Sequence, residues 1–373
     1  MKHLVKTNWL RVMFLLAALL LYPAGGPRAG EAKPSWQVEW EKTLAAAKKE
    51  GKVVVVGPAV ASHREAILAF TQNFPDIQLE YVGMSPAERN PRIARERQGG
   101  LYTFDVIVSG TGPTIFTDEI PGGWYEPLKT ALILPEVLDD RKWLGGFDAG
   151  FSDRGKKYAY AFTLNLFASL YVNRDSIPEA ELRKTEDLLH PRLKGKIVWN
   201  DPRTRGPGSF IFAHLRSIMG DGGLRGLIID QESVITQDSR QLAEWVVRGR
   251  YPIGIGVDPS NLATFQKEGL GLNVKPFDLP VEVVTPSFGG VQLMNRAPHP
   301  NAVKIFLNWL LSQPAQGLWA KLGAVNSRRL DVPPGDPPTA PDPKRLDKYR
   351  NLSSEDQLSV RTEALKFAKT LLP

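Results

Sequence analysis

The chain of 373 residues contains no cysteine. Disulfide bonds, thiolate metal sites and a cysteine nucleophile are therefore excluded. A lipid anchor attached to a cysteine at an export cleavage site is excluded for the same reason. If the protein is exported, we expect it to leave the membrane as a free polypeptide.

Sequence signatures of catalysis are also missing. The chain has no HExxH, no GxSxG and no Walker A sequence, and SGTGPT is only a fragment of a dinucleotide fingerprint. Histidine is scarce and lacks the spacing of metal ligands; beyond the first 32 residues it occurs at His63, His190, His214 and His299. We therefore assign no catalytic residue, no metal site and no cofactor.

Long apolar runs are absent after the first 32 residues. Near the start, a basic head precedes Val12 to Tyr22, an uncharged run of eleven residues. Such a run is too short to span a bilayer but has the length of a signal-peptide core. Gly30 and Ala32 then supply the small residues of a cleavage site. We predict a signal peptide over residues 1–32 and a mature protein that begins near Lys33; an uncleaved anchor helix is the alternative.

The formal charge of +7 overstates the mature protein. Loss of residues 1–32 removes four basic residues and one acidic residue, which leaves +4. This mild excess is evenly spread, so no nucleic-acid partner is expected. About 340 mature residues exceed what one hydrophobic core usually supports, so we expect two lobes.

Strand and helix signals alternate along the chain. Val53 to Val56 is a continuous β-branched run of the kind found in parallel strands buried on both faces. Asp105 to Val108 and Pro252 to Val257 repeat this style, and helical patterns lie between. The alternation predicts an α/β protein with doubly wound sheets. A helix over residues 86–98 would carry a solvated face of Arg89, Arg92, Arg95 and Arg97.

Residues 331–343 contain six prolines in thirteen positions. This density opposes both helix and sheet, so we expect an extended strap there. A last helix is predicted from Ser354 to Leu371.

Several segments together resemble the family of bacterial extracellular solute-binding proteins, which includes receptors for ferric iron, thiamine and phosphorylated sugars. The segments are WEKTLAAAKKEGKVVVVGPA, TFDVIVSGTG, KIVWNDPRTRGPGS, GRYPIGIG and HPNAVKIFLNWLLSQPAQGLWAKLG. They appear in the family's order over most of residues 36–330.

The resemblance implies a two-lobed type II periplasmic-binding fold, in which hinge closure traps a small-molecule solute between the lobes. On this interpretation, lobe one comprises residues 33–130 and 286–335, and lobe two comprises residues 131–285 and 336–373.

It also implies a monomeric receptor in a Gram-negative periplasm, with an inner-membrane ABC permease and its cytoplasmic ATPase as partners. A sensory subunit that presents its ligand to a membrane receptor, and a periplasmic enzyme on the same fold, are the alternatives. Iron-binding members carry an adjacent tyrosine pair after the strand that PIGIGV resembles. Here Val257-Asp258-Pro259-Ser260 stands in that place, so ferric iron is not expected.

Four loops follow predicted strands, where open α/β sheets bind their ligands. They cover residues 58–64, 109–114, 201–209 and 258–261. Arg203 and Arg205 flank a Gly-Pro-Gly turn before a helix start, an arrangement suited to binding an organic anion. Ordinary turn chemistry and solvated arginines are the alternatives. For the ligand, the alternative is a cation such as thiamine or a polyamine, held by Asp258 and by aromatic rings such as Phe288. The candidate ligand-binding residues are Ser62, Ser109, Thr111, Gly112, Asp201, Arg203, Arg205, Gly208, Ser209, Asp258 and Ser260.

Overall fold

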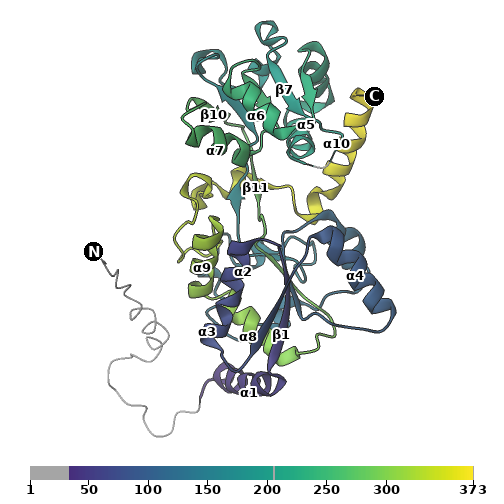
Figure 1. Cartoon of the computed structure of the whole chain (residues 1–373), viewed down its shortest axis with the longest axis vertical. Coiled ribbons are helices and arrows are strands. Elements are labelled where there is room, and N and C mark those ends of the chain that lie inside the picture. The colour runs from purple at the N-terminus through teal and green to yellow at the C-terminus, as the bar shows by residue number, and fades with distance from the viewer. Residues whose placement is uncertain (1–32, 205, 373) are drawn as a thin grey trace, which may run out of the picture.

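The computed structural model describes residues 33–204 and 206–372. The predicted signal peptide and Arg205 lie outside these residues. Figure 1 shows a lower lobe built around β1 and an upper lobe built around β7, with β11 between them. The predicted two-lobed α/β organisation is confirmed, and a small third sheet lies at the junction.

The first lobe contains a five-stranded sheet in the order β2-β1-β3-β12-β4. Its strands are β1 (Lys52–Gly57), β2 (Gln78–Gly83), β3 (Val106–Val108), β4 (Tyr160–Ala161) and β12 (Gly290–Leu293). β1 runs parallel to β2 and β3, whereas β12 runs antiparallel to β3 and β4. Because side chains alternate along a strand, Val53 and Val55 enter one core while Val54 and Val56 enter another. The β-branched run is therefore buried on both faces, as predicted.

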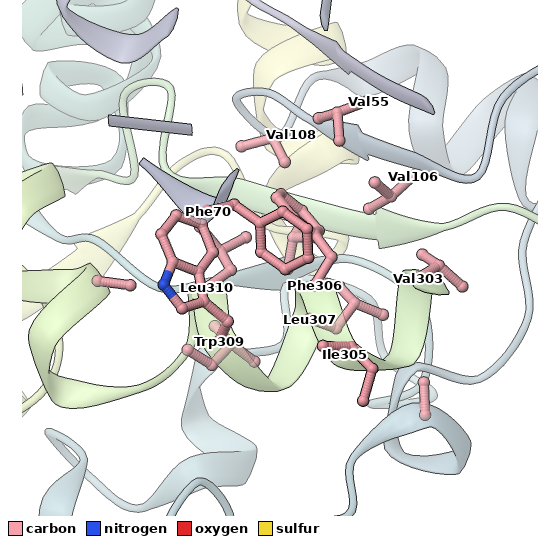
Figure 2. Packing of buried hydrophobic residues seen from close by; sticks show 14 of the residues in the cluster. Val55, Phe70, Val106, Val108, Val303, Ile305, Phe306, Leu307, Trp309 and Leu310 are labelled. Carbon is pink, nitrogen blue, oxygen red and sulfur yellow. The ribbon is translucent and has the colours of Figure 1, made fainter. Parts of the chain in front are cut away.

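Helices cover both faces of this sheet. They are α1 (Ser35–Glu50), α2 (Ala61–Leu68), α3 (Phe70–Asn73), α4 (Pro86–Gln98), α8 (Pro300–Leu310) and α9 (Gln313–Gly323). The apolar face of α8 fills the larger core, where Phe306 lies against Phe70, as Figure 2 shows. Buried Asn308 accepts hydrogen bonds from the Ile133 and Leu134 amides at 2.9 Å each, so it joins α8 to the preceding segment.

The second lobe repeats the architecture with a sheet in the order β10-β6-β9-β7-β8. Its strands are β6 (Leu170–Asn173), β7 (Ile197–Asn200), β8 (Val234–Thr236), β9 (Ile253–Ile255) and β10 (Val274–Pro276). Its helices are α5 (Pro207–Arg225), α6 (Ser239–Val247), α7 (Pro259–Lys267) and α10 (Leu358–Leu371).

Short 3-10 and π turns connect these elements. They cover Ile115–Glu119, Leu128–Ala131, Asp140–Lys142, Phe147–Gly150, Glu179–Glu181, Thr185–Leu189, Pro191–Leu193, Gly226–Asp230, Pro337–Thr339, Pro343–Lys348 and Glu355–Gln357.

The lobes are joined by β5 (Asn165–Leu166) and β11 (Glu282–Thr285), which pair antiparallel. β13 (Tyr349–Asn351) adds a third, parallel strand to β11. The chain first passes from lobe one to lobe two at β5, so the lobe boundary that was predicted at residue 131 is wrong. Residues 131–162 belong to lobe one, because β4 pairs with β12 and Trp143 and Phe147 pack in its main core.

The C-terminal segment contacts both lobes. Beside lobe one, the Glu355 amide donates to the Ser152 carbonyl at 2.8 Å, and Arg154 pairs with Asp356 at 2.7 Å. α10 then packs against α5, and Ala364 and Ala368 enter the second lobe's core. In Figure 1, α10 runs along the side of the upper lobe to the C-terminus.

Only two of the four α4 arginines, Arg92 and Arg95, are exposed as the predicted solvated face requires. Arg89 is only 2% exposed and lies beside buried Glu119, with a nitrogen–oxygen distance of 3.7 Å. Arg97 donates to the Gly123 carbonyl at 2.8 Å and to Asn295 at 2.6 Å. The guanidinium groups of Arg89 and Arg97 therefore form contacts within lobe one.

Phe306→Ala tests the main core. Phe306 is fully buried and makes edge contacts with Phe70, at a ring distance of 5.5 Å. Emptying this site should lower the free energy of unfolding by about 3–5 kcal/mol. Chemical denaturation measures the change, with Leu101→Ala as the control because Leu101 is 58% exposed. Equal stability of the two variants would show that Phe306 does not pack in the core as described.

Candidate functional site

The strand ends of lobe one point towards lobe two. α1 directly precedes β1 and lies at the end of the lower lobe that is farthest from the upper lobe (Figure 1). The carboxyl ends of β1 and of its parallel neighbours β2 and β3 therefore face the other lobe. At these ends begin two of the loops in which ligand-binding residues were predicted.

The first loop leads into α2, whose N-terminus has no side-chain cap. The Arg64 amide bonds to the Val60 carbonyl at 3.0 Å, so the N–H groups of the preceding turn have no acceptor within the helix. Ser62 lies in that turn, and its hydroxyl is 3.5 Å from Nδ1 of His63. An uncapped helix start carries a partial positive charge and free donors, which suit an anion.

A pocket of about 310 Å³ opens beside this helix start. It is lined by Pro58, Ala59, Val60, Ala61, Arg64, Tyr81 and Gly83. The Tyr81 hydroxyl donates to the Pro58 carbonyl at 2.5 Å, and burial raises the pKa of Tyr81 to about 12. Tyr81 is therefore a neutral wall, and the cationic group of the pocket is the exposed side chain of Arg64.

Arg64 was not among the predicted site residues, although it ends a loop that was. No other described side chain forms a hydrogen bond or an ion pair with its guanidinium group. Its position four residues after an N-cap places its charge next to the open helix turn. Sequence could indicate this position but could not show that the charge is left unpaired.

The second loop contains Ser109, Thr111 and Gly112. The Ser109 amide donates to the Gly290 carbonyl at 2.8 Å, which holds the loop on β12. Thr111 is buried, and its hydroxyl has no partner among the described residues. Gly112 is open: a Cβ there would meet no atom within 4 Å. The loop thus offers a hydroxyl and an unobstructed backbone.

A buried polar network supports this loop from behind. Glu119 is fully buried and accepts hydrogen bonds from Asn90 and Thr114 at 2.8 Å each, and from the Tyr125 hydroxyl. Burial, together with contact with this carboxylate, raises the pKa of Tyr125 above its ordinary value. The network fixes the turn that follows Gly112.

The third loop does not present Arg203 in the way that was expected. Arg203 binds Asp201 in a fork, with Nε–Oδ1 and Nη2–Oδ2 distances of 3.0 and 2.9 Å. Arg203 also donates to the Leu372 carbonyl at 3.2 Å. Asp201 further accepts from Gln237 at 3.1 Å, and the Arg203 guanidinium holds the pKa of Asp201 at about 2. The charge of Arg203 is therefore largely balanced within the protein.

Gly208 and Ser209 form the start of α5. A Cβ at Gly208 would lie 2.0 Å from the Asn200 carbonyl oxygen, so only glycine lets this helix approach β7. The Ser209 hydroxyl donates to the Gly206 carbonyl at 3.1 Å. Phe210 contacts Phe167, which directly follows β5, at a ring distance of 5.3 Å. The start of α5 therefore lies on the hinge side of lobe two.

The fourth loop is occupied by a helix cap. Asp258 is the N-cap of α7 and accepts hydrogen bonds from the Ser260 amide at 2.9 Å and from its hydroxyl. This is the local pairing that Asp favours at a helix start. The Asp258 carboxylate and the Ser260 hydroxyl therefore form a hydrogen bond with each other in the loop after β9.

The structure thus groups the predicted residues into two sets. Ser62, Ser109, Thr111 and Gly112 lie at the lobe-one strand ends, and Asp201, Arg203, Gly208, Ser209, Asp258 and Ser260 lie at those of lobe two. Within residues 33–204 and 206–372, no group of three or more His, Asp or Glu side chains could hold a metal ion. None of the helices in the same ranges has the length and apolar character needed to cross a membrane.

Arg203→Ala tests the ion pair with Asp201. The pKa of Asp201 should rise from about 2 towards 3.8. A carboxyl whose folded-state pKa is depressed stabilises the protein above its unfolded pKa, and this contribution is lost as the pH falls through the folded value. At neutral pH the free energy of unfolding of the variant should be lower by about 1–2 kcal/mol. This figure is reduced for solvent screening, because Arg203 is 34% exposed.

The difference in stability should shrink between about pH 4 and about pH 2. Urea denaturation at several pH values measures it. Arg248→Ala is the matched control, because Arg248 pairs with Glu244 on the exposed face of α6. A difference in stability between wild type and Arg203→Ala that does not change with pH would argue against the Asp201–Arg203 ion pair.

Comparison with known proteins extends this description. Residues 148–324 match the sequence model of the family described as bacterial extracellular solute-binding protein. An uncharacterised protein of Haemophilus influenzae is 26% identical over 164 residues, which are 43% of this chain and 46% of that protein. The match thus spans about half the length of this curated relative.

Solved structures share the fold over most of the chain. An ABC transporter protein from Clostridium perfringens has a TM-score of 0.65 and 15% identity, covering 86% of this chain and 100% of its own. A Bordetella ferric binding protein has a TM-score of 0.62 and 19% identity, with coverages of 86% and 98%. A Trichodesmium protein in complex with iron and citrate has a TM-score of 0.61 and 17% identity, with coverages of 86% and 99%.

The predicted resemblance and the predicted fold class are both confirmed. The chain carries the sequence signature of the bacterial extracellular solute-binding proteins over residues 148–324, and its fold is that of the two-lobed periplasmic-binding proteins.

Proposed function

We propose that the protein is a periplasmic receptor of an ABC import system that captures a small organic anion between its lobes and delivers it to an inner-membrane permease with a cytoplasmic ATPase. One observation carries the ligand class. The uncapped start of α2 and the unpaired guanidinium of Arg64 border the same pocket at a strand end that faces the other lobe.

The physical reason is electrostatic complementarity. The N-terminus of a helix carries about half a positive charge, and Arg64 adds a full one. No described carboxylate pairs with Arg64, so this charge is available to a solute. By contrast, Arg203 is bound to Asp201, and its role in the proposal is to hold the lobe-two loop in shape.

The remaining residues complete the cleft in this proposal. Ser62 and the backbone near Gly112 would donate to the anion from lobe one, and Thr111 would offer its buried hydroxyl. Lobe two would close with the backbone near Gly208 and Ser209. Arg205 would add a second charge, and Asp258 and Ser260 would meet polar groups elsewhere on the solute.

Capture rather than chemistry is favoured by the partners of the candidate nucleophiles. The Ser209 hydroxyl donates to a backbone carbonyl, and the Ser260 hydroxyl donates to the capping carboxylate of its own helix. An enzyme would need a nucleophile bonded to a general base that a third group orients. These serines instead have the bonds of helix starts.

A thermal-shift screen of organic anions and organic cations against residues 33–373 tests the ligand class. Anions should raise the melting temperature, because a ligand that binds only the folded state stabilises it. Arg64→Gln should weaken binding of each anionic hit at least tenfold, from the loss of a charge-assisted bond of about 1.5–3 kcal/mol. Arg95→Gln is the matched control, since it removes the same charge from an exposed position on α4.

Hinge closure is tested on the same hits by small-angle scattering, where the bound protein should have a smaller radius of gyration. Stabilisation by cations alone, or equal anion affinity of Arg64→Gln and Arg95→Gln, would refute the anion proposal. A tightly bound hit that leaves the radius unchanged would refute closure.

A further inference from the structure

An exposed phenylalanine stands where the hinge enters lobe one. β11 ends at Thr285 and β12 begins at Gly290, so residues 286–289 lie at the carboxyl edge of the first sheet, the edge that faces lobe two. Phe288 in this connection is 43% exposed. A large ring left in solvent at such a place calls for an explanation.

The backbone that carries the ring is strained. Ser287 has a φ of 51°, in the left-handed region that residues other than glycine, asparagine and aspartate rarely adopt. Such strain costs free energy and persists only where the surroundings impose it, and it is concentrated at functional sites. The conformation of Ser287 thus has to be held by its neighbours.

Two neighbouring residues, Gly110 and Thr163, pack closely against the connection. A Cβ at Gly110 would lie 2.3 Å from the Ser287 carbonyl oxygen, and a Cβ at Gly289 would lie 1.9 Å from the Thr163 hydroxyl. Thr163 itself donates to the Pro286 carbonyl at 2.5 Å. The ring is therefore displayed by a rigid, closely packed turn rather than by a loose loop.

The Phe288 ring also packs against a buried aromatic pair, His63 and Trp319. His63 contacts Phe288 edge-on at a ring distance of 5.3 Å, and Trp319 contacts His63 in the same manner at 4.8 Å. Burial lowers the pKa of His63, so the imidazole in contact with Phe288 is neutral. Because His63 belongs to the first turn of α2, this contact places Phe288 against the helix start that also carries Arg64.

We propose that Phe288 is an aromatic platform of the binding site and that the solute is an anion with a planar ring. The ring would stack on Phe288 while the anionic group occupies the start of α2 beside Arg64. This deepens the proposed function and rests on it. Aromatic stacking contributes beyond burial alone, which makes a planar ring preferable to an alkyl group of similar area.

A cation on the face of Phe288 fits the surroundings less well. The carboxylates among the predicted site residues, Asp201 and Asp258, are already engaged by Arg203 and by Ser260. Arg64 is the cationic side chain of the pocket at this helix start and would repel a cation. The surroundings of the platform thus favour an anion.

Phenyl phosphate and cyclohexyl phosphate, two monoesters with six ring carbons each, separate a planar ring from apolar area when they are titrated at about pH 8, where both are dianions. Ligand-observed NMR titrations with residues 33–373 should give about three- to tenfold tighter binding of phenyl phosphate. Phe288→Leu keeps an apolar side chain without a ring and should bring the two affinities together. Leu272→Ala, at a position 59% exposed in lobe two, should leave the preference unchanged.

Equal affinities in the wild type, a preference that survives Phe288→Leu, or no binding of phenyl phosphate would each overturn the platform. So would tighter binding of benzyltrimethylammonium than of phenyl phosphate. Inorganic phosphate, titrated against wild type and Arg64→Gln, reports on the anion site by itself. If it binds while the esters do not differ, the proposed function stands and only the platform fails.

Discussion

β11 is paired on both of its edges, and the arrangement of the molecule depends on this pairing. Val284 lies opposite Leu166 of β5 on one side and Asn351 of β13 on the other. The strand then continues through residues 286–289 into β12, the fourth strand of the lobe-one sheet. Hinge, connection and sheet are thus one continuous stretch. A rotation of the lobes would bend the chain at the crossing strands β5 and β11, outside the closely packed turn that carries Phe288.

Elements defined by local pattern could be predicted from sequence. Val53 to Val56 is a buried strand because four β-branched residues leave no polar face, and α8 follows the helical spacing of its apolar residues, most of which are buried. The lobe boundary could not be predicted, because residues 131–162 form short turns without periodicity. Their place is decided by distant contacts, such as Tyr160 opposite Val291. β13 was missed for the same reason: it is three residues long and pairs only through tertiary structure.

The positions of the candidate loops could be predicted from sequence, but which arginine in them is available to a ligand could not. Loops that follow parallel strands meet at one edge of a sheet, so the positions of Ser62, Thr111 and Ser209 follow from topology. Whether an arginine is available depends on its neighbours. Asp201 and Arg203 are two residues apart in a turn, where the aspartate binds both the amide and the guanidinium of Arg203. Asp258 binds Ser260 across the same spacing. The sequence pattern did not show that these residues form turn and capping bonds with one another.

The distribution of paired and unpaired charges then limits what the cleft can select. A helix start and one free arginine attract anions in general, so they contribute affinity with little discrimination. Discrimination requires a second contact whose geometry is fixed before binding, because an ordered group pays little entropy when the solute arrives. The locked turn around Ser287 meets this requirement, since crowding at Gly110 and Gly289 leaves it no room to relax. Under the proposal, the strain at Ser287 is the energetic cost of presenting one ring in one orientation next to the proposed anion site.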